Sequence, residues 1–447
     1  MILSAENRGS LDRLLGLWDD LVDPRVGIVQ AVAELPTDDD DPDLFHYMSK
    51  ACDTSVFTPL SNFSDNGGAS MSRLVAIAKA LGEAVERYCS ALYRRDELRL
   101  ARYADLEEPA VDPEALVVYR PEQFGQPGFP WRPLHRESPV RWTGGTSLAT
   151  GEPILLPASL VWLPFHYPTA ERSTPFCQPI STGLACGCSF EEAALSGLCE
   201  VIERDAFTIT WQARLGRRRI RPDSLPAAVR ELVGRFTRVG IDVKLMDITT
   251  DIAVPTVMTI GLSNVVTAPA VAVSAATDPS AERAAIKSLE ELAHTRKYAK
   301  QLWQYLPPLP VEVAKGHPIV KDQKDHLRFY CPQSAKAYAE FAWSSTEECG
   351  LSDVGGAGAR TEDELGWVVD ALQRVGLHPI ACDVTSEDVR GLGLRVVRAV
   401  VPGAHPLYMG HVNRALGVRR LYDVPPRLGY RGLVPGDDDN PFPHPFP

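Results

Sequence analysis

Hydrophobic residues recur at helical spacing in three long stretches of the chain. Apolar positions three and four residues apart predict helices over residues 71–95, 190–211 and 280–304. In the first of these, the apolar face consists of Leu74, Ala78, Leu81 and Val85. Ser189 precedes the second helix and Glu192 follows three residues later, which is the capping-box pattern of a helix N-terminus. A shorter amphipathic helix is expected near the N-terminus.

Shorter apolar runs between these helices predict strands. The runs lie at residues 27–33, 243–246, 254–260, 270–275, 380–384 and 396–401. Residues 100–180 are rich in proline and β-prone pieces, and we expect strands and loops there. Two segments near the N-terminus are predicted as loops: the acidic run 38–43, expected to be solvated, and the Gly/Ser/Asn-rich stretch 61–70. The C-terminal region is expected to be mostly coil.

Charge and cysteine content narrow the classes of function. The formal net charge is −12, so the chain gains nothing from the counterion release that drives nucleic-acid binding and is not drawn to an anionic membrane. No signal peptide and no apolar stretch of about 18 residues is present. The nine cysteines are odd in number and irregularly spaced, which favours reduced thiols, and Cys186 and Cys188 are better explained as buried thiols than as metal ligands. We therefore expect a cytoplasmic enzyme without a nucleic-acid or membrane partner.

Two of the predicted helices carry the same acidic pattern, Glu-x-x-Glu-Arg. Residues three apart share a helix face, so Glu83 projects with Glu86, and Glu200 projects with Glu203. Like charges on one face repel, and a Mg²⁺ ion that bridges nucleotide phosphates would remove this repulsion. Ordinary exposed helices with internal ion pairs explain the same spacing, and the spacing alone leaves both explanations open.

The sequence also offers places for an anion. There is no GxxxxGK[ST] loop, so a P-loop nucleotide site is not expected. The small residues 181–187 precede the second long helix, and their N–H groups suit an anion cradle near a helix N-terminus. His411 and Arg414 are either phosphate contacts or ordinary surface residues.

Taken together, several blocks of the sequence resemble the YcaO family. The blocks are Ala80-Leu-Gly-Glu-Ala-Val-Glu-Arg-Tyr88, Ser181-Thr-Gly-Leu-Ala185, Cys199-Glu-Val-Ile-Glu-Arg-Asp205, residues 287–296, Val396-Val-Arg398 and Leu421-Tyr-Asp-Val-Pro425. The resemblance implies an α+β, YcaO-type ATP-binding fold, with mixed or antiparallel sheets and packed helices that carry the acidic motifs.

The resemblance also implies the site residues. Glu83, Glu86, Glu200 and Glu203 would bind Mg²⁺ and ATP. Arg204 and Arg296 would engage phosphate or neighbouring acids, and Ser181 and Thr182 would lie on the nucleotide-binding turn. Lys79 and Ser196 stand at nucleotide-contact positions where family members often carry Ser and Gln, so the details of that contact depart from the family pattern.

The C-terminus, Pro443-His-Pro-Phe-Pro447, resembles the ending of the azoline-forming subgroup, the cyclodehydratase "D proteins". In that subgroup the tail extends into the active site, which implies a catalytic role for the Pro447 carboxylate beside Glu203 and Arg204. Alternating prolines favour such an extended, low-entropy conformation. A disordered proline-rich tail is the alternative. The implied reaction converts Cys, Ser or Thr of a ribosomal precursor peptide to thiazoline or oxazoline, with ATP consumed.

The resemblance implies partners and a division of the chain. Residues 1–60 are expected to contribute to partner docking, and residues 61–447 to form the catalytic domain. We expect a separate leader-peptide-binding partner of the ubiquitin-activating-enzyme-like type, a flavin dehydrogenase acting later, and a homodimer. Thioamidation and macroamidine formation are alternatives within the family, and the PxPxP ending argues against both. A non-catalytic YcaO-like scaffold is a further alternative, and the intact glutamate pairs weigh against it.

Overall fold

The computed structural model describes residues 5–58, 60–168, 171–307, 309–310, 319–355, 363–434 and 436–446. The chain forms two compact units, which are described separately. The first comprises Met1–Leu35, His46–Val201 and Asp363–Ala404, and the second comprises Pro36–Phe45, Ile202–Glu362 and His405–Pro447. The long helix α5 (Phe190–Gln212) contributes residues to both.

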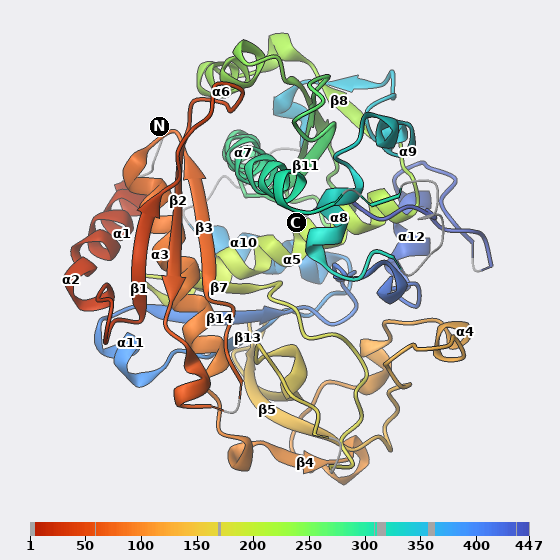
Figure 1. The fold of residues 1–447 in the computed structure, drawn as a ribbon. Helices are drawn as coiled ribbons and strands as arrows, with labels where there is room; N and C mark the ends of the chain where they lie inside the picture. The colour runs from red at the N-terminus through yellow and green to blue at the C-terminus, as the bar shows by residue number, and fades with distance from the viewer. Residues whose placement is uncertain are drawn as a thin grey trace. The chain divides into compact units, whose positions relative to one another are not determined.

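A three-stranded sheet and one long helix form the N-terminal part of the first unit (Figure 1). The strands are ordered β1 (Val29–Glu34), β2 (Phe45–Ala51) and β3 (Asp65–Ser70), with β1 and β2 antiparallel. Helix α3 (Arg73–Ala91) packs against β3 and β1, and α1 (Ala5–Gly16) packs against α3. Buried Leu81, Ala84 and Val29 lie between the helix and this sheet. A four-residue helix, α2 (Trp18–Leu21), follows α1.

Strand β3 shows that the loop predicted for residues 61–70 is wrong over its second half. Glycines are rare in strands, but Gly68 lies where α3 approaches most closely. A Cβ atom on Gly68 would come within 2.5 Å of the Lys79 Cβ and 2.7 Å of the Ala76 carbonyl oxygen. The glycine composition, which indicated a loop, thus reflects tight packing of a strand on a helix.

A six-stranded sheet forms the rest of the first unit. Its order is β4-β5-β13-β14-β7, and β6 pairs with β5. The strands are β4 (Arg99–Ala101), β5 (Val140–Ser147), β6 (Pro153–Pro157), β7 (Leu184–Gly187), β13 (Ile380–Asp383) and β14 (Arg395–Val400). The accompanying helices are α4 (Pro121–Phe124), α10 (Glu364–Arg374) and α11 (Glu387–Gly391). Buried Trp142, Leu156 and Val396 belong to the main core of this unit.

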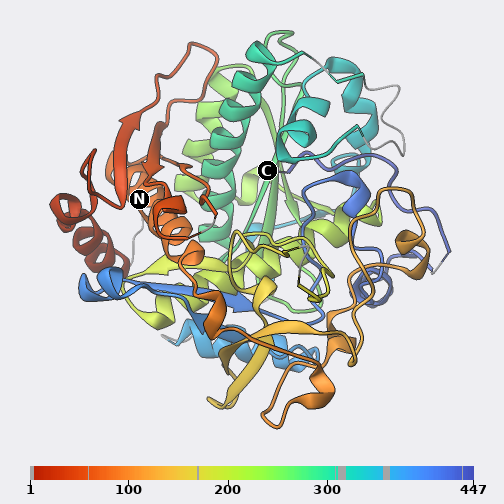
Figure 2. The same cartoon turned by 60° about the horizontal axis from the view of Figure 1, so that its bottom comes forward.

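The second unit is built on a five-stranded sheet covered by helix α7 (Ala281–Tyr305). The strand order is β11-β10-β9-β8-β12, and in Figures 1 and 2 α7 runs beside β10 and β11. The strands are β8 (Arg218–Ile220), β9 (Asp242–Asp247), β10 (Thr256–Leu262), β11 (Val271–Thr277) and β12 (Glu348–Cys349). The remaining helices are α6 (Ala227–Arg238), α8 (Gln323–Phe329), α9 (Lys336–Ala339) and α12 (Arg420–Arg427).

Most predicted elements are confirmed, as is the α+β fold class. The three long helices agree with α3, α5 and α7 to within a few residues, and the Ser280 hydroxyl caps α7 by accepting the Arg283 N–H (3.4 Å). The coil expected near the C-terminus contains α12, whose Pro425 and Pro426 masked its helical pattern.

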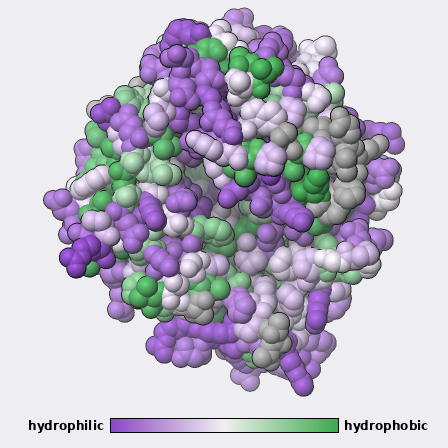
Figure 3. Space-filling view, viewed as in Figure 1, coloured by the Kyte–Doolittle hydropathy of each residue, from purple (hydrophilic) through white to green (hydrophobic). Residues whose placement is uncertain are grey.

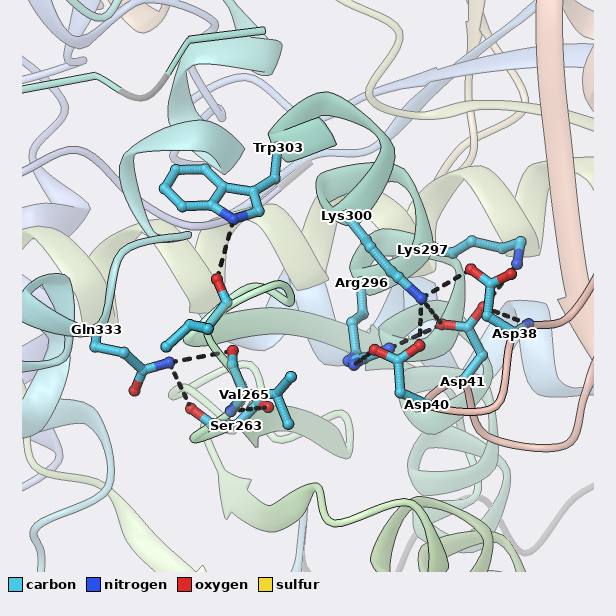
Figure 4. A network of polar contacts seen from close by, with 11 residues as sticks. Asp38, Asp40, Asp41, Ser263, Val265, Arg296, Lys297, Lys300, Trp303 and Gln333 are labelled. Carbon is cyan, nitrogen blue, oxygen red and sulfur yellow. Dashed lines mark hydrogen bonds and ion pairs between the residues drawn. The ribbon is translucent and has the colours of Figure 1, made fainter. Parts of the chain in front are cut away.

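The acidic run 38–43 is a loop with Asp38, Asp39 and Asp43 exposed, but the prediction that it is solvated is wrong for Asp41. Asp41 is buried and forms ion pairs with cations of α7, as Figure 4 shows. Composition favoured a solvated loop, but three basic residues more than 250 positions later in the chain compensate the acids.

Hydrophilic residues are spread over the face of the molecule drawn in Figure 3, with hydrophobic residues between them. Within the described residues, none of the helices has the length and apolar character needed to cross a bilayer. All nine cysteines are free thiols, as expected for reduced cysteines.

The close approach at Gly68 yields a prediction. Gly68→Ala should destabilise the protein by about 1–3 kcal/mol, because the added methyl meets helix backbone that has little room to move. Gly144→Ala in β5 is the matched control, since a Cβ there meets nothing within 4 Å. Urea unfolding measures both variants, and equal stability of the two would contradict the packing described for β3.

Candidate functional site

Glu83, in the middle of α3, is held between a strand and its own helix. Its Oε2 accepts the N–H of Gly67 in β3 (2.9 Å), and its Oε1 pairs with Arg87 Nη2 at 3.0 Å. The side chain of Glu83 is about one-third exposed and that of Arg87 is 15% exposed. The Glu-x-x-Glu-Arg motif therefore supplies its own counterion one turn later.

Two further glutamates are fixed by backbone N–H groups at β7. Glu86 Oε1 accepts the N–H of Cys186 (3.1 Å), and Glu200 Oε2 accepts the N–H of Gly183 (3.0 Å). Gly183 has φ +88°, and a Cβ there would collide with the Ala399 carbonyl. The turn before β7 therefore requires glycine at this position.

The three carboxylates influence one another. Burial raises the pKa of Glu86 to about 8; Arg87 opposes the rise, and the charges of Glu83 and Glu200 add to it. The same three glutamates raise the pKa of Arg87 against the effect of burial. Glu83, Glu86 and Glu200 thus form one electrostatic cluster, called the glutamate cluster below.

A cavity of about 350 Å³ in the first unit opens beside this cluster. Glu83, Glu86 and the predicted residues Lys79 and Ser196 line it, together with Ser10, Leu11, Leu14, Val75, Ala78, Gly82, Ala185, Cys186, Gly187, Cys188, Glu192 and Leu394. Lys79 Nζ donates to the Ala69 carbonyl (3.0 Å), so its ammonium stays near β3. The cavity places a cation, hydroxyls and carboxylates around one space.

The predicted capping box at Ser189 is half confirmed. The Ser189 hydroxyl accepts the Glu192 N–H (3.1 Å), as the pattern predicts. The Glu192 carboxylate turns instead to the Cys188 N–H (2.9 Å) and the Ser10 hydroxyl (3.0 Å). Glu192 is thereby a cavity residue that the capping pattern did not identify.

The turn with Ser181 and Thr182 leads into β7, and both residues are partly buried. Next to it, Arg398 of β14 donates to the carbonyls of Leu160 (2.9 Å) and Ile180 (2.7 Å). Burial lowers the pKa of Arg398 to about 10, and the charge of Glu200 opposes that shift. Arg398 was matched only as part of a family block, and its role in fixing this turn is seen only in the structure.

In the second unit, Glu203 and Arg204 lie beside the C-terminal tail. Glu203 is 7% exposed, and its Oε1 lies 3.6 Å from Arg204 Nη1. The Arg204 guanidinium lies over the Phe446 ring, 4.4 Å from its centroid. Phe446 is fully buried and also packs on Phe207, with 4.3 Å between ring centroids.

The tail is anchored along its length, so within residues 436–446 it is not the disordered segment that the alternative supposed. His326 Nδ1 lies 2.8 Å from the His444 carbonyl oxygen, and the Tyr330 hydroxyl donates to that of Pro443 (2.6 Å). His411, for which a phosphate contact and an ordinary surface position were both open, is buried, and its Nε2 lies 3.0 Å from the Pro441 carbonyl oxygen. Pro447 lies outside the described residues.

The remaining predicted residue, Arg296, lies in the second unit and pairs with Asp40 and Asp41. Within the described residues, no group of three or more His, Cys, Asp or Glu side chains is arranged to hold a metal ion. The cavity beside the glutamate cluster therefore offers carboxylates for a cation without a complete protein coordination shell.

Comparisons with known proteins agree with this fold. Residues 67–405 match the family model described as YcaO cyclodehydratase, ATP- and Mg²⁺-binding. An uncharacterized protein of Methanothermobacter thermautotrophicus is 30% identical over 251 residues, which cover 54% of this chain and 61% of that protein. The chain thus covers less than two thirds of this relative.

Two solved structures share the fold. A heterocyclase in complex with substrate and cofactor has a TM-score of 0.78 at 21% identity, over 98% of this chain and 57% of that chain. YcaO from Methanopyrus kandleri bound with AMPPCP and Mg²⁺ has a TM-score of 0.66 at 19% identity, over 96% of this chain and 95% of that chain. Because the family model spans most of the sequence and the fold agrees with it, the chain belongs to the YcaO family.

Proposed function

We propose that this protein is an ATP-dependent cyclodehydratase that converts Cys, Ser or Thr residues of a ribosomally made precursor peptide to azolines. The observation that carries the proposal is the glutamate cluster, in which the charges of three carboxylates act on one another and two of them, Glu83 and Glu86, line a cavity. Packing like charges together lowers the stability of the fold unless a bound cation compensates their repulsion. The family model's description as ATP- and Mg²⁺-binding names such a ligand.

The residues present fit Mg²⁺ with a nucleotide. Mg²⁺ prefers carboxylate oxygens, keeps several waters and is usually completed by phosphates, so few protein ligands suffice. Glu83, Glu86, Glu200 and Glu203 are proposed as its carboxylate ligands. The bound ion would neutralise phosphate charge during transfer. Lys79, Ser181, Thr182, Ser196 and Arg296 would contact the nucleotide.

The reaction begins when a substrate thiol or hydroxyl adds to the carbonyl carbon of the preceding residue. The resulting hemiorthoamide oxygen takes the γ-phosphoryl group of ATP, and ADP is released. Phosphate then leaves as the C=N bond forms and the amide proton is lost. The protein's share is mainly positioning and charge compensation, since an amide oxygen leaves poorly until it is phosphorylated.

Arg204 and the tail would act on the peptide side of this reaction. The guanidinium of Arg204 is held between Glu203 and the Phe446 ring, which restricts its orientation. Phe446 contacts Arg204, and Pro447 follows it in the sequence, so the Pro447 carboxylate is proposed as base or orienting group. The PxPxP ending supports cyclodehydration over thioamidation or macroamidine formation.

The proposal includes partner proteins. One structural neighbour is a microcin synthetase complex with a pro-peptide bound, which shows that this fold occurs within a multi-protein synthetase. We propose a precursor peptide as substrate, a separate leader-binding protein as partner, residues 1–60 as part of their contact, and a flavin dehydrogenase acting later. A homodimer is also proposed.

The first prediction concerns the glutamates. Glu83→Gln and Glu203→Gln should each lower ATP turnover by about 100-fold or more, because each removes a carboxylate proposed to hold the Mg²⁺ ion that neutralises the charge of the transferring phosphoryl group. Each variant is incubated with peptide, partner and ATP, and the ADP released is measured. Mass spectrometry of the peptide detects the loss of one water for each ring formed. Glu191→Gln, an exposed change in the first turn of α5, is the control. Undiminished ADP release by either test variant, or exchange of oxygen for sulfur in the peptide, would refute the proposal.

The second prediction concerns pH. Because the pKa of Glu86 is about 8 without a cation, Mg²⁺ binding must release its proton. The affinity for Mg²⁺ with AMPPCP should therefore rise by about tenfold from pH 6.5 to pH 8.5. Glu86→Gln keeps the acceptor for the Cys186 N–H and should show only the titration of the nucleotide itself. Calorimetric titration of both proteins decides this, and identical pH profiles would exclude Glu86 from the metal site.

The third prediction concerns the tail. Removal of residues 445–447 should reduce cyclisation by about 100-fold or more, because it removes the Phe446 contact with Arg204 and displaces the terminal carboxylate. A variant extended by two glycines keeps Phe446 in place and moves only the carboxylate. Full cyclisation by the extended protein would show that the position of the carboxylate has no role. Full cyclisation by the trimmed protein would show that the tail has no role.

A further inference from the structure

Residues 36–45 connect β1 to β2 and belong to the second unit. This segment, called the acidic connection below, carries Asp38, Asp40 and Asp41 against three cations of α7. The cations are Arg296, Lys297 and Lys300, and Figure 4 shows the six side chains facing one another. Three acids and three bases make the network neutral as a whole.

Asp41 is the bridging member of this network. Its Oδ1 accepts from Arg296 Nη1 at 2.9 Å, and its Oδ2 accepts from Lys297 Nζ at 2.8 Å. Asp40 Oδ2 lies 3.3 Å from Arg296 Nη2. Two carboxylates therefore hold the two terminal nitrogens of one guanidinium, while Lys300 pairs with Asp38 (2.8 Å) and with Asp40.

Two of the paired charges, those of Asp41 and Arg296, are buried and depend on each other for compensation. Asp41 is 4% exposed and Arg296 is 2% exposed, so neither charge is solvated by bulk water. Burial by itself would raise the pKa of Asp41, but the hydrogen bond and charge of Lys297 outweigh it and the pKa lies below its usual value. The carboxylate therefore stays ionised, and Arg296 always meets a full negative charge.

We propose that Asp41 is a positioning residue for Arg296, fixing the guanidinium that the proposed function assigns to the nucleotide site. The inference rests on that proposed function. An arginine side chain has several rotatable bonds, and holding two of its nitrogens at once selects one orientation. With Nη1 and Nη2 held in this way, Arg296 Nε has no hydrogen-bond partner among the described residues. The acidic connection thus holds both terminal nitrogens and leaves the buried Nε as the guanidinium nitrogen without a partner among the described residues.

The acidic connection itself offers the matched control. Asp38→Asn removes the same charge from the same segment, but among the described residues Asp38 reaches Lys300 and not Arg296. Lys297→Gln removes the second partner of Asp41 and leaves the Arg296 pair intact. If loosening the segment were the whole effect, these variants would behave like Asp41→Asn.

The experiment uses the full chain at a temperature well below the unfolding midpoint of every variant. Asp41→Asn should weaken binding of AMPPCP with Mg²⁺, and raise KM for ATP, by about tenfold or more, because a misplaced guanidinium loses its contact. Asp38→Asn and Lys297→Gln should change both by less than about threefold, although their unfolding midpoints fall. Asp41→Glu should recover part of the affinity.

A double-mutant cycle separates positioning from general stability. In an Arg296→Ala background, Asp41→Asn should weaken nucleotide binding no further, since its effect acts through the missing guanidinium. An additive loss, or equal losses in Asp41→Asn and Asp38→Asn, would overturn the positioning role alone. Failure of Arg296→Ala to weaken binding would overturn it as well. Failure of the unaltered protein to bind AMPPCP with Mg²⁺ would overturn the proposed function, and this inference with it.

Discussion

Compensation of charge that has been taken out of water is the constraint on which the rest of the structure depends. A carboxylate or guanidinium away from solvent is costly unless hydrogen bonds and opposite charges replace its hydration. In the first unit, Glu83, Glu86 and Glu200 meet this requirement with backbone N–H groups and Arg87. In the second unit, Asp41 meets it with two cations of α7. Backbone details such as the positive φ of Gly183 follow from the need to aim N–H groups at these acids.

The two units satisfy the constraint to different degrees, and this difference suggests their roles. In the acidic connection, Asp38, Asp40 and Asp41 are matched by three cations of α7, so this network stabilises and orients. The glutamate cluster sets three carboxylates against Arg87, and burial, with the charges of Glu83 and Glu200 adding to it, raises the pKa of Glu86 to about 8. Incomplete compensation beside a cavity is typical of a functional site, because the missing charge is left for a ligand. A magnesium-bound nucleotide would supply the compensating positive charge, and its binding would stabilise the folded protein.

Much of this was predictable from the sequence because local pattern determines local structure. Helical spacing placed Glu83 with Glu86 on one face, and apolar runs located most strands. Two of the failures, β3 and the acidic run, share a cause: both segments have loop-like composition, and both make contacts with distant partners. Gly68 packs on α3 and Asp41 pairs with Arg296, contacts that no local pattern encodes. Arg87 was not predicted as a site residue, although it is the final arginine of the Glu-x-x-Glu-Arg motif and the sequence therefore contained the signal.

The central claim is that the glutamate cluster is a nucleotide site completed by a cation. Calorimetric titration of the protein with AMPPCP, with and without Mg²⁺, and then of Glu200→Gln with both, tests this most directly. The account predicts saturable binding that requires Mg²⁺ and weakens by about tenfold or more in Glu200→Gln, as expected when a metal ligand is lost. Binding that is equally tight without Mg²⁺, or unchanged by the substitution, would contradict it.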